Sequence, residues 1–86
     1  MSKLKSIAEQ WQSYYDAMLK PLNASKVQVN ETRQAFYAGA WAMFVGAEAI
    51  GDEDISEAQG VKYLEDCKRE CESFKDELMA RYVEGN

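Results

Sequence analysis

Two cysteines carry the most reactive side chains of this 86-residue chain, Cys67 and Cys71. They stand four positions apart, a spacing that puts both thiols on one face of a helix. A zinc site needs four ligands, and the chain has no histidine and no second cysteine pair to complete one. A disulfide within one helical turn would need unusual geometry. We therefore expect two buried, reduced thiols, with no metal site and no cofactor.

Carboxylates gather in one short segment, the acidic turn formed by Asp52, Glu53, Asp54 and Glu57. The segment lacks the length and spacing of a calcium loop, so we expect it to be a solvated helix cap. The sequence shows no glycine-rich phosphate loop, no nucleophile beside a paired base and no pair of buried carboxylates. The lack of histidine also removes the commonest general base. These features predict a protein that is not an enzyme and has no catalytic residues.

Three helical segments must position these residues, at about 3–20, 26–50 and 55–82, because apolar side chains recur in each every three or four residues. A chain of 86 residues has room for one domain. The sequence therefore predicts an all-α, single-domain three-helix bundle spanning residues 1–86. At this size stability is marginal unless the packing is tight or a second subunit helps.

Start and stop signals flank each predicted helix. Pro21 ends the first, because proline lacks the donor N–H and disfavours helix in the residue before it. The second starts at a cap formed by Ser25 with Gln28, or by Asn30, and stops at Gly51.

The third helix combines a narrow apolar stripe with a densely charged surface. Asp54 with Glu57 would cap its N-terminus as an aspartate variant of the capping box. The stripe consists of Val61, Leu64, Cys67, Cys71, Phe74, Leu78 and Tyr82. Opposite charges four apart predict the ion pairs Lys62–Asp66, Glu65–Arg69, Lys68–Glu72 and Glu77–Arg81. This pattern is typical of a helix with one side on the core and the rest in water.

The second helix has a seam of very small residues and is apolar nearly all round. The seam consists of Ala35, Gly39, Ala42, Gly46 and Ala49. Glycine inside a helix costs about 0.5–1 kcal/mol relative to alanine, so two glycines indicate that a neighbour needs the space. The neighbour is either another helix of the same chain or a second copy in a homodimer. A helix apolar nearly all round must be covered on most of its circumference, so we expect this helix to be central.

Large aromatic and charged side chains share the adjoining sector of the second helix. Its members are Arg33, Tyr37, Trp41, Phe44 and Glu48. The sector is either ordinary core with polar tips at the rim, or a partner-binding surface, because these residue types are enriched at interface hot spots.

The net charge is −5, from 15 acidic and 10 basic residues. This charge repels phosphate backbones and anionic lipids, so we expect neither direct nucleic-acid binding nor membrane binding. The N-terminal segment lacks the apolar core of a secretory signal, and no uncharged run approaches the roughly 20 residues that span a bilayer. We therefore expect a cytoplasmic protein.

One segment resembles a known group of proteins. The string Glu31-Thr32-Arg33-Gln34-Ala35-Phe36-Tyr37-Ala38-Gly39-Ala40, with the later blocks 60–65 and 70–74, is similar to small uncharacterised tailed-bacteriophage (prophage) proteins. The similarity covers about residues 30–75. It implies a phage origin and a host-cytoplasm setting, and it supplies no catalytic residues.

Together these features predict a non-enzymatic phage-type interaction module, an inhibitor or adaptor acting on a host or phage protein. The first alternative is a structural homo-oligomer assembled through the second helix. The second alternative is an acidic decoy that mimics nucleic acid, against which the interspersed lysines and arginines of the last helix argue.

Overall fold

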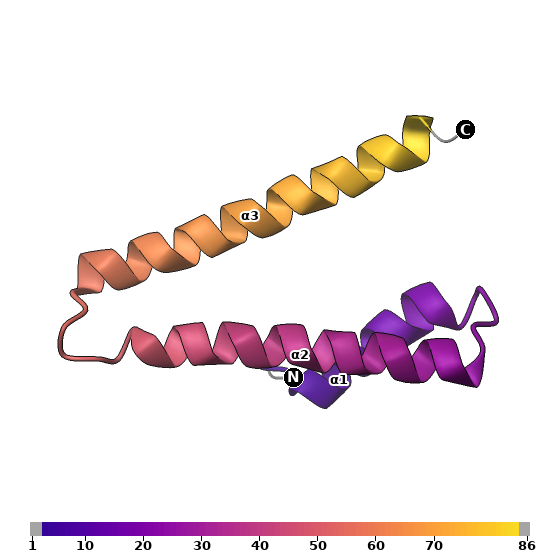
Figure 1. Ribbon diagram of the computed structural model, residues 1–86, viewed down its shortest axis with the longest axis horizontal. Coiled ribbons are helices and arrows are strands. Elements are labelled where there is room, and N and C mark those ends of the chain that lie inside the picture. The colour runs from indigo at the N-terminus through magenta and orange to yellow at the C-terminus, as the bar shows by residue number, and fades with distance from the viewer. Residues whose placement is uncertain (1–2, 85–86) are drawn as a thin grey trace. The chain divides into compact units, whose positions relative to one another are not determined.

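The computed structural model describes the backbone of residues 3–84 and the side chains of residues 3–81. Its elements are α1 (Ile7–Tyr14), the π-helical turn η1 (Tyr15–Leu19), α2 (Lys26–Ala49) and α3 (Glu57–Glu84) (Figure 1). The described residues contain no strand, so the predicted all-α class with three helices is confirmed. The chain divides into two compact units, Met1–Val45 and Gly46–Asn86, called here the first and the second unit.

Helix α1 begins later than the expected residue 3, because Ser6 acts as its N-cap. Ser6 has an extended backbone, and its hydroxyl accepts a hydrogen bond from the Glu9 backbone N–H at 3.1 Å. The Glu9 carboxylate in turn accepts the Ser6 backbone N–H at 2.9 Å. This reciprocal capping box satisfies two N–H groups that the first turn leaves without partners. The hydrogen bond from the Ser6 backbone N–H lowers the pKa of Glu9.

The π-helical turn η1 has a physical cause in Pro21. Proline has no N–H to donate to the Ala17 carbonyl, and in an α-helix its ring would collide with that carbonyl. One extra residue per turn relieves the collision, and the Lys20 N–H donates to the Tyr15 carbonyl at 2.9 Å.

The helical turn ends at Asn23, two residues after Pro21. Asn23 has φ of 54°, in the left-handed region that asparagine tolerates better than most residues. The Ala24 N–H donates to the Leu19 carbonyl at 3.3 Å, and the Asn23 N–H to the Lys20 carbonyl at 3.1 Å. This Schellman arrangement ends the helical turn, whereas the sequence predicts the stop at Pro21.

Helix α2 begins at the first of its two predicted caps. The Ser25 hydroxyl accepts the Gln28 N–H at 3.2 Å, and the Gln28 side chain accepts the Ser25 N–H at 2.9 Å. At its other end, i→i−3 bonds from Ile50, Gly51 and Asp52 tighten the last turn. The helix thus ends at Ala49, and Gly51 does not have a positive φ.

Helix α3 is capped by a different residue from the one predicted. Ser56 accepts the Gln59 N–H at 3.1 Å, and Gln59 accepts the Ser56 N–H at 2.8 Å. The predicted pair of Asp54 and Glu57 is wrong, because Asp54 belongs to the preceding turn and Glu57 is the first residue of the helix. Serine with glutamine three residues later satisfies both backbone donors.

The core of the first unit is a cluster of aromatic rings around Trp11. Trp11 is 8% exposed, and its ring meets Phe36 of α2 edge-on at 5.5 Å between centroids. Tyr14 lies 5.8 Å from Phe36 and 6.1 Å from Trp11. These separations lie in the range of favourable aromatic pairs, so the cluster fixes α1 against α2.

In the second unit, glycines allow close approach between the end of α2 and α3. A Cβ at Gly60 would lie 2.6 Å from Cγ2 of Ile50, and a Cβ at Gly46 would lie 2.8 Å from Cζ of Tyr63. Gly60 is buried. The sequence predicts that a neighbour needs the space beside Gly46, and this neighbour is the Tyr63 phenol.

Candidate partner-binding surface

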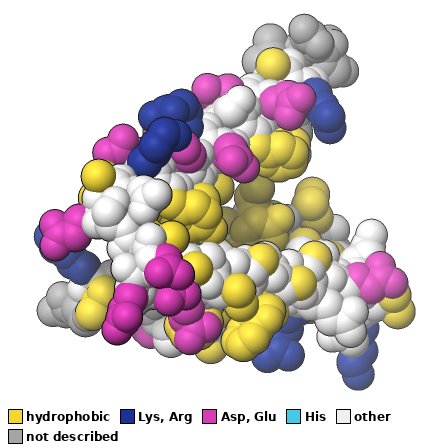
Figure 2. Space-filling model, turned by 60° about the vertical axis from the view of Figure 1, so that its left-hand side comes forward, with side chains coloured by type: hydrophobic (Ala, Val, Ile, Leu, Met, Phe, Trp, Pro, Cys, Tyr) yellow, Lys and Arg dark blue, Asp and Glu magenta, His cyan; other side chains and the backbone are white. Residues whose placement is uncertain are grey.

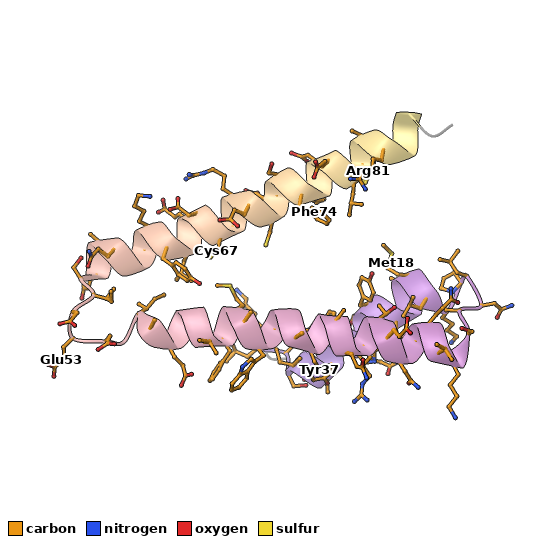
Figure 3. The ribbon with its side chains drawn as sticks, viewed as in Figure 1. Met18, Tyr37, Glu53, Cys67, Phe74 and Arg81 are labelled. Atoms are coloured by element: carbon orange, nitrogen blue, oxygen red, sulfur yellow. The ribbon has the colours of Figure 1, made fainter. Side chains whose placement is uncertain are left out.

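Four of the five predicted partner-binding residues lie in the first unit on α2, and contacts link them in two pairs. The Arg33 guanidinium lies over the Tyr37 ring, 5.3 Å from its centroid, which is a cation–π contact. Tyr37 is half-buried, and its ring centroid also lies 6.1 Å from that of Phe36. Tyr37, which is labelled in Figure 3, thus contacts both Phe36 of the aromatic core and Arg33.

Trp41 and Phe44 form the second pair. Their rings stack at 5.9 Å between centroids with an interplanar angle of 29°. Trp41 is nonetheless 66% exposed and Phe44 54% exposed. Both rings are therefore exposed and lie outside the aromatic cluster around Trp11. None of the residues of α2 is buried.

Two hollows meet at Tyr37, which lines both of them. One has a volume of about 330 Å³ and is lined by Ile7, Tyr37, Ala40, Trp41 and Phe44. The other has a volume of about 410 Å³ and is lined by Asn30, Arg33, Gln34 and Tyr37. An apolar hollow thus adjoins a polar one that the Arg33 guanidinium lines. We call the two hollows together the aromatic face.

The fifth predicted residue, Glu48, lies in the second unit and is exposed. The structure therefore does not add Glu48 to the aromatic face. Ile7 of α1 does line it, a contribution that the sequence analysis missed. The only signal for Ile7 was its apolar character at the start of a helix, because contacts between helices leave no mark in local spacing.

The members of the small-residue seam have different surroundings. Ala35 and Ala42 are exposed, and no heavy atom lies within 4 Å of where a Cβ of Gly39 would stand. Gly46 contacts Tyr63. Ala49 lines a hollow of about 200 Å³ in the second unit, together with Gly46, Ile50, Ile55, Gln59, Gly60 and Tyr63. The two units therefore share the seam, and its close contact with another helix is at Gly46, in its last part.

The cysteines are both free, as expected, but their burial differs from the prediction. Cys67 is half-buried and Cys71 is exposed, so the expectation of two buried thiols is wrong. A hydrogen bond with the Cys67 thiol raises the pKa of Tyr63. Within the described residues, no three side chains of the kinds that ligate metals gather in one place.

Ion pairs on α3 converge on one carboxylate. Asp66 accepts from Lys62, four residues before it, at 2.7 Å and from Arg69, three residues after it, at 3.3 Å. The Lys62–Asp66 pair is confirmed, whereas Arg69 pairs with Asp66 in place of the predicted Glu65. The hydrogen bond from Lys62 lowers the pKa of Asp66. Charged side chains of both signs are visible along α3 in Figure 2.

No helix in the described part of the chain is both long enough and apolar enough to cross a membrane. Comparisons of the chain with protein-family models, with curated proteins and with solved structures found no match.

Proposed function

We propose that this protein is a non-enzymatic interaction module that binds another protein through the aromatic face of α2. The observation that carries the proposal is the exposed stack of Trp41 on Phe44, 66% and 54% exposed. An indole that contributes little to the core of its own chain is a strong candidate for an anchor, because tryptophan is enriched among hot-spot residues. The adjoining apolar hollow gives a partner side chain a place to insert.

The aromatic face suits a partner segment with an apolar side chain flanked by a carboxylate. The apolar side chain would fill the hollow beside Trp41, and the carboxylate would meet Arg33 in the polar hollow. The guanidinium is already oriented by the Tyr37 ring, so less of its conformational freedom is lost on binding.

The resemblance to small tailed-bacteriophage proteins, which covers about residues 30–75, supports a phage setting. In that setting the partner is a host or phage protein in the bacterial cytoplasm. The module acts on this partner as an inhibitor or as an adaptor. The net charge of −5 makes nucleic acid and anionic membranes poor partners at long range.

The test is affinity capture from bacterial lysate with three versions of the full chain as bait: the wild type, Trp41→Ala and Val27→Ala. Val27 is 65% exposed on the same helix and does not line the aromatic face, so it is a matched control. We expect a protein that the wild type and Val27→Ala retain and that Trp41→Ala loses. Its affinity for Trp41→Ala should fall about 30-fold or more, the effect of losing a hot-spot residue.

Urea unfolding of the same variants separates a surface role from a core role. Because Trp41 is largely exposed, Trp41→Ala should keep most of the free energy of unfolding. Equal capture by the wild type and Trp41→Ala would refute the proposal. A loss of about 3 kcal/mol of stability would do the same, because it would make Trp41 a core residue.

A further inference from the structure

The apolar stripe of α3 has the spacing of a coiled-coil seam. Five consecutive members of the stripe follow one another in alternating steps of three and four residues, which is the seven-residue repeat that brings two helices together along one line. The seam consists of Leu64, Cys67, Cys71, Phe74 and Leu78. Leu64 is 46% exposed, Phe74 57% and Leu78 39%, and Cys71 is exposed as well. Cys67 and Phe74 are labelled on α3 in Figure 3.

The charges that flank this seam are sorted by sign. In the heptad that the seam defines, Lys68 and Lys75 occupy the position after the second seam residue (position e). Glu70 and Glu77 occupy the position before the first seam residue (position g). All four side chains are exposed, and none forms an ion pair with another side chain among residues 3–81. Their charges are therefore available to a neighbouring helix.

Sorting by sign selects the orientation of the second helix. In a parallel pair, position g of one helix faces position e of the other, so Glu70 would face Lys75 of the second copy. In an antiparallel pair, e faces e and g faces g, which would set lysine against lysine and glutamate against glutamate. Only the parallel pair is complementary.

We propose that a second copy of this chain covers the α3 seam, with the two α3 helices parallel and in register. The pairing uses a different helix from the aromatic face, so it stands or falls independently of the proposed function. It also fits the small cores of the two units, in which Trp11 and Gly60 are the only buried residues that the structure describes. A second subunit is a common way to stabilise a chain of this size.

The two cysteines allow the register to be tested directly. In a parallel pair in register, each seam residue faces its own copy, so the single-thiol variants Cys67→Ser and Cys71→Ser should each form a disulfide-linked dimer. Diamide serves as the oxidant and takes two electrons and two protons from each pair of thiols. The product should run at twice the chain mass of 9.8 kDa on a non-reducing gel and should disappear when urea is present during oxidation. An antiparallel pair centred between the two cysteines would cross-link only in a mixture of the two variants. That result, or the failure of either variant alone to form the linked dimer, would overturn the proposal.

Charge exchange provides a second test that does not depend on the thiols. The positive side chain that Glu70→Lys introduces would face Lys75 of the second copy, and this repulsive contact would occur twice per dimer. The dissociation constant measured by sedimentation equilibrium should therefore rise roughly tenfold. Adding Lys75→Glu to this variant should restore the dimer. Glu72→Lys makes the same charge change outside the flanking positions and should leave the dimer intact. A wild-type chain that stays monomeric up to high micromolar concentration would overturn the proposal.

Discussion

Replacing Gly60 by alanine tests the packing of the second unit most sharply. The added Cβ would stand 2.6 Å from Cγ2 and 3.8 Å from Cβ of Ile50. Carbon atoms in contact prefer about 3.5–4.0 Å, so the first of these distances must lengthen by about 1 Å. The methyl carbon Cγ2 is bonded directly to Cβ of a β-branched residue with a stiff χ1, so it cannot swing away freely. Helix α3 and the end of α2 must therefore separate.

Two opposing terms set the size of the effect. Overpacking of this kind costs about 1–3 kcal/mol, whereas alanine gains about 0.5–1 kcal/mol over glycine in a helix. The steric term is the larger, so Gly60→Ala should lower the free energy of unfolding by about 1 kcal/mol. For a chain of this length, that loss corresponds to a fall in Tm of about 4–8 °C.

Gly39→Ala is the matched control, because no heavy atom would meet its Cβ within 4 Å. The same chemical change should here stabilise the protein by about 0.5–1 kcal/mol through helix propensity alone. Far-ultraviolet circular dichroism during urea unfolding measures both variants, and their midpoints should move in opposite directions.

An Ile50→Ala background isolates the steric contact. Because Ile50→Ala removes Cγ2, Gly60→Ala in this background should be neutral or stabilising, and the cycle of four proteins then gives the coupling between the two sites. If Gly60→Ala stabilises the wild-type chain as much as Gly39→Ala does, Gly60 and Ile50 are not in contact and the reasoning fails.

Three further predictions concern other parts of the chain. Trp11→Ala should cost about 3–5 kcal/mol of stability, measured by urea unfolding, because Trp11 is 8% exposed and contacts three other aromatic rings. Asn23→Ala should lower the Tm while Asn23→Gly should not. The reason is that φ at this position is 54°, a conformation that costs alanine about 1 kcal/mol more than it costs asparagine or glycine. The lowered pKa values of Glu9 and Asp66 mean that folding favours their ionised forms. Their contribution to stability is therefore complete above the unfolded pKa of about 4 and is lost as the pH falls through the lower folded values. Urea midpoints measured between pH 6 and pH 2 should show less of this loss in Glu9→Gln, which can still form the cap.

The sequence predicted well the features that depend on local spacing. Three helices followed from apolar periodicity, and the observed cap of α2, Ser25 with Gln28, was one of the two that the sequence predicts. Both signals act within four residues of the chain, a range over which hydrogen-bond partners are fixed by helix geometry. The cap of α3 was missed although Ser56 and Gln59 have the same spacing, because the acidic residues before them offered a competing N-terminus.

Features that depend on contacts between helices were harder to predict. The sector of Tyr37, Trp41 and Phe44 was found from its residue types, but only the structure shows the stack and its exposure. Ile7 joins that sector from another helix, 30 residues away from Tyr37 in sequence. Likewise, the contact of Gly60 with Ile50 comes from the turn between α2 and α3, whose path no periodicity describes.

The contrast between the two tryptophans gives the chain two built-in fluorescent reporters. Trp11 is 8% exposed among other rings, whereas Trp41 is 66% exposed. A soluble quencher such as acrylamide should therefore extinguish the emission of Trp41 first and leave the blue-shifted emission of Trp11. Docking at the aromatic face would shield the quenchable fraction, and unfolding would enlarge it. One quencher titration, without any attached label, can thus distinguish a partner-bound chain from an unfolded one.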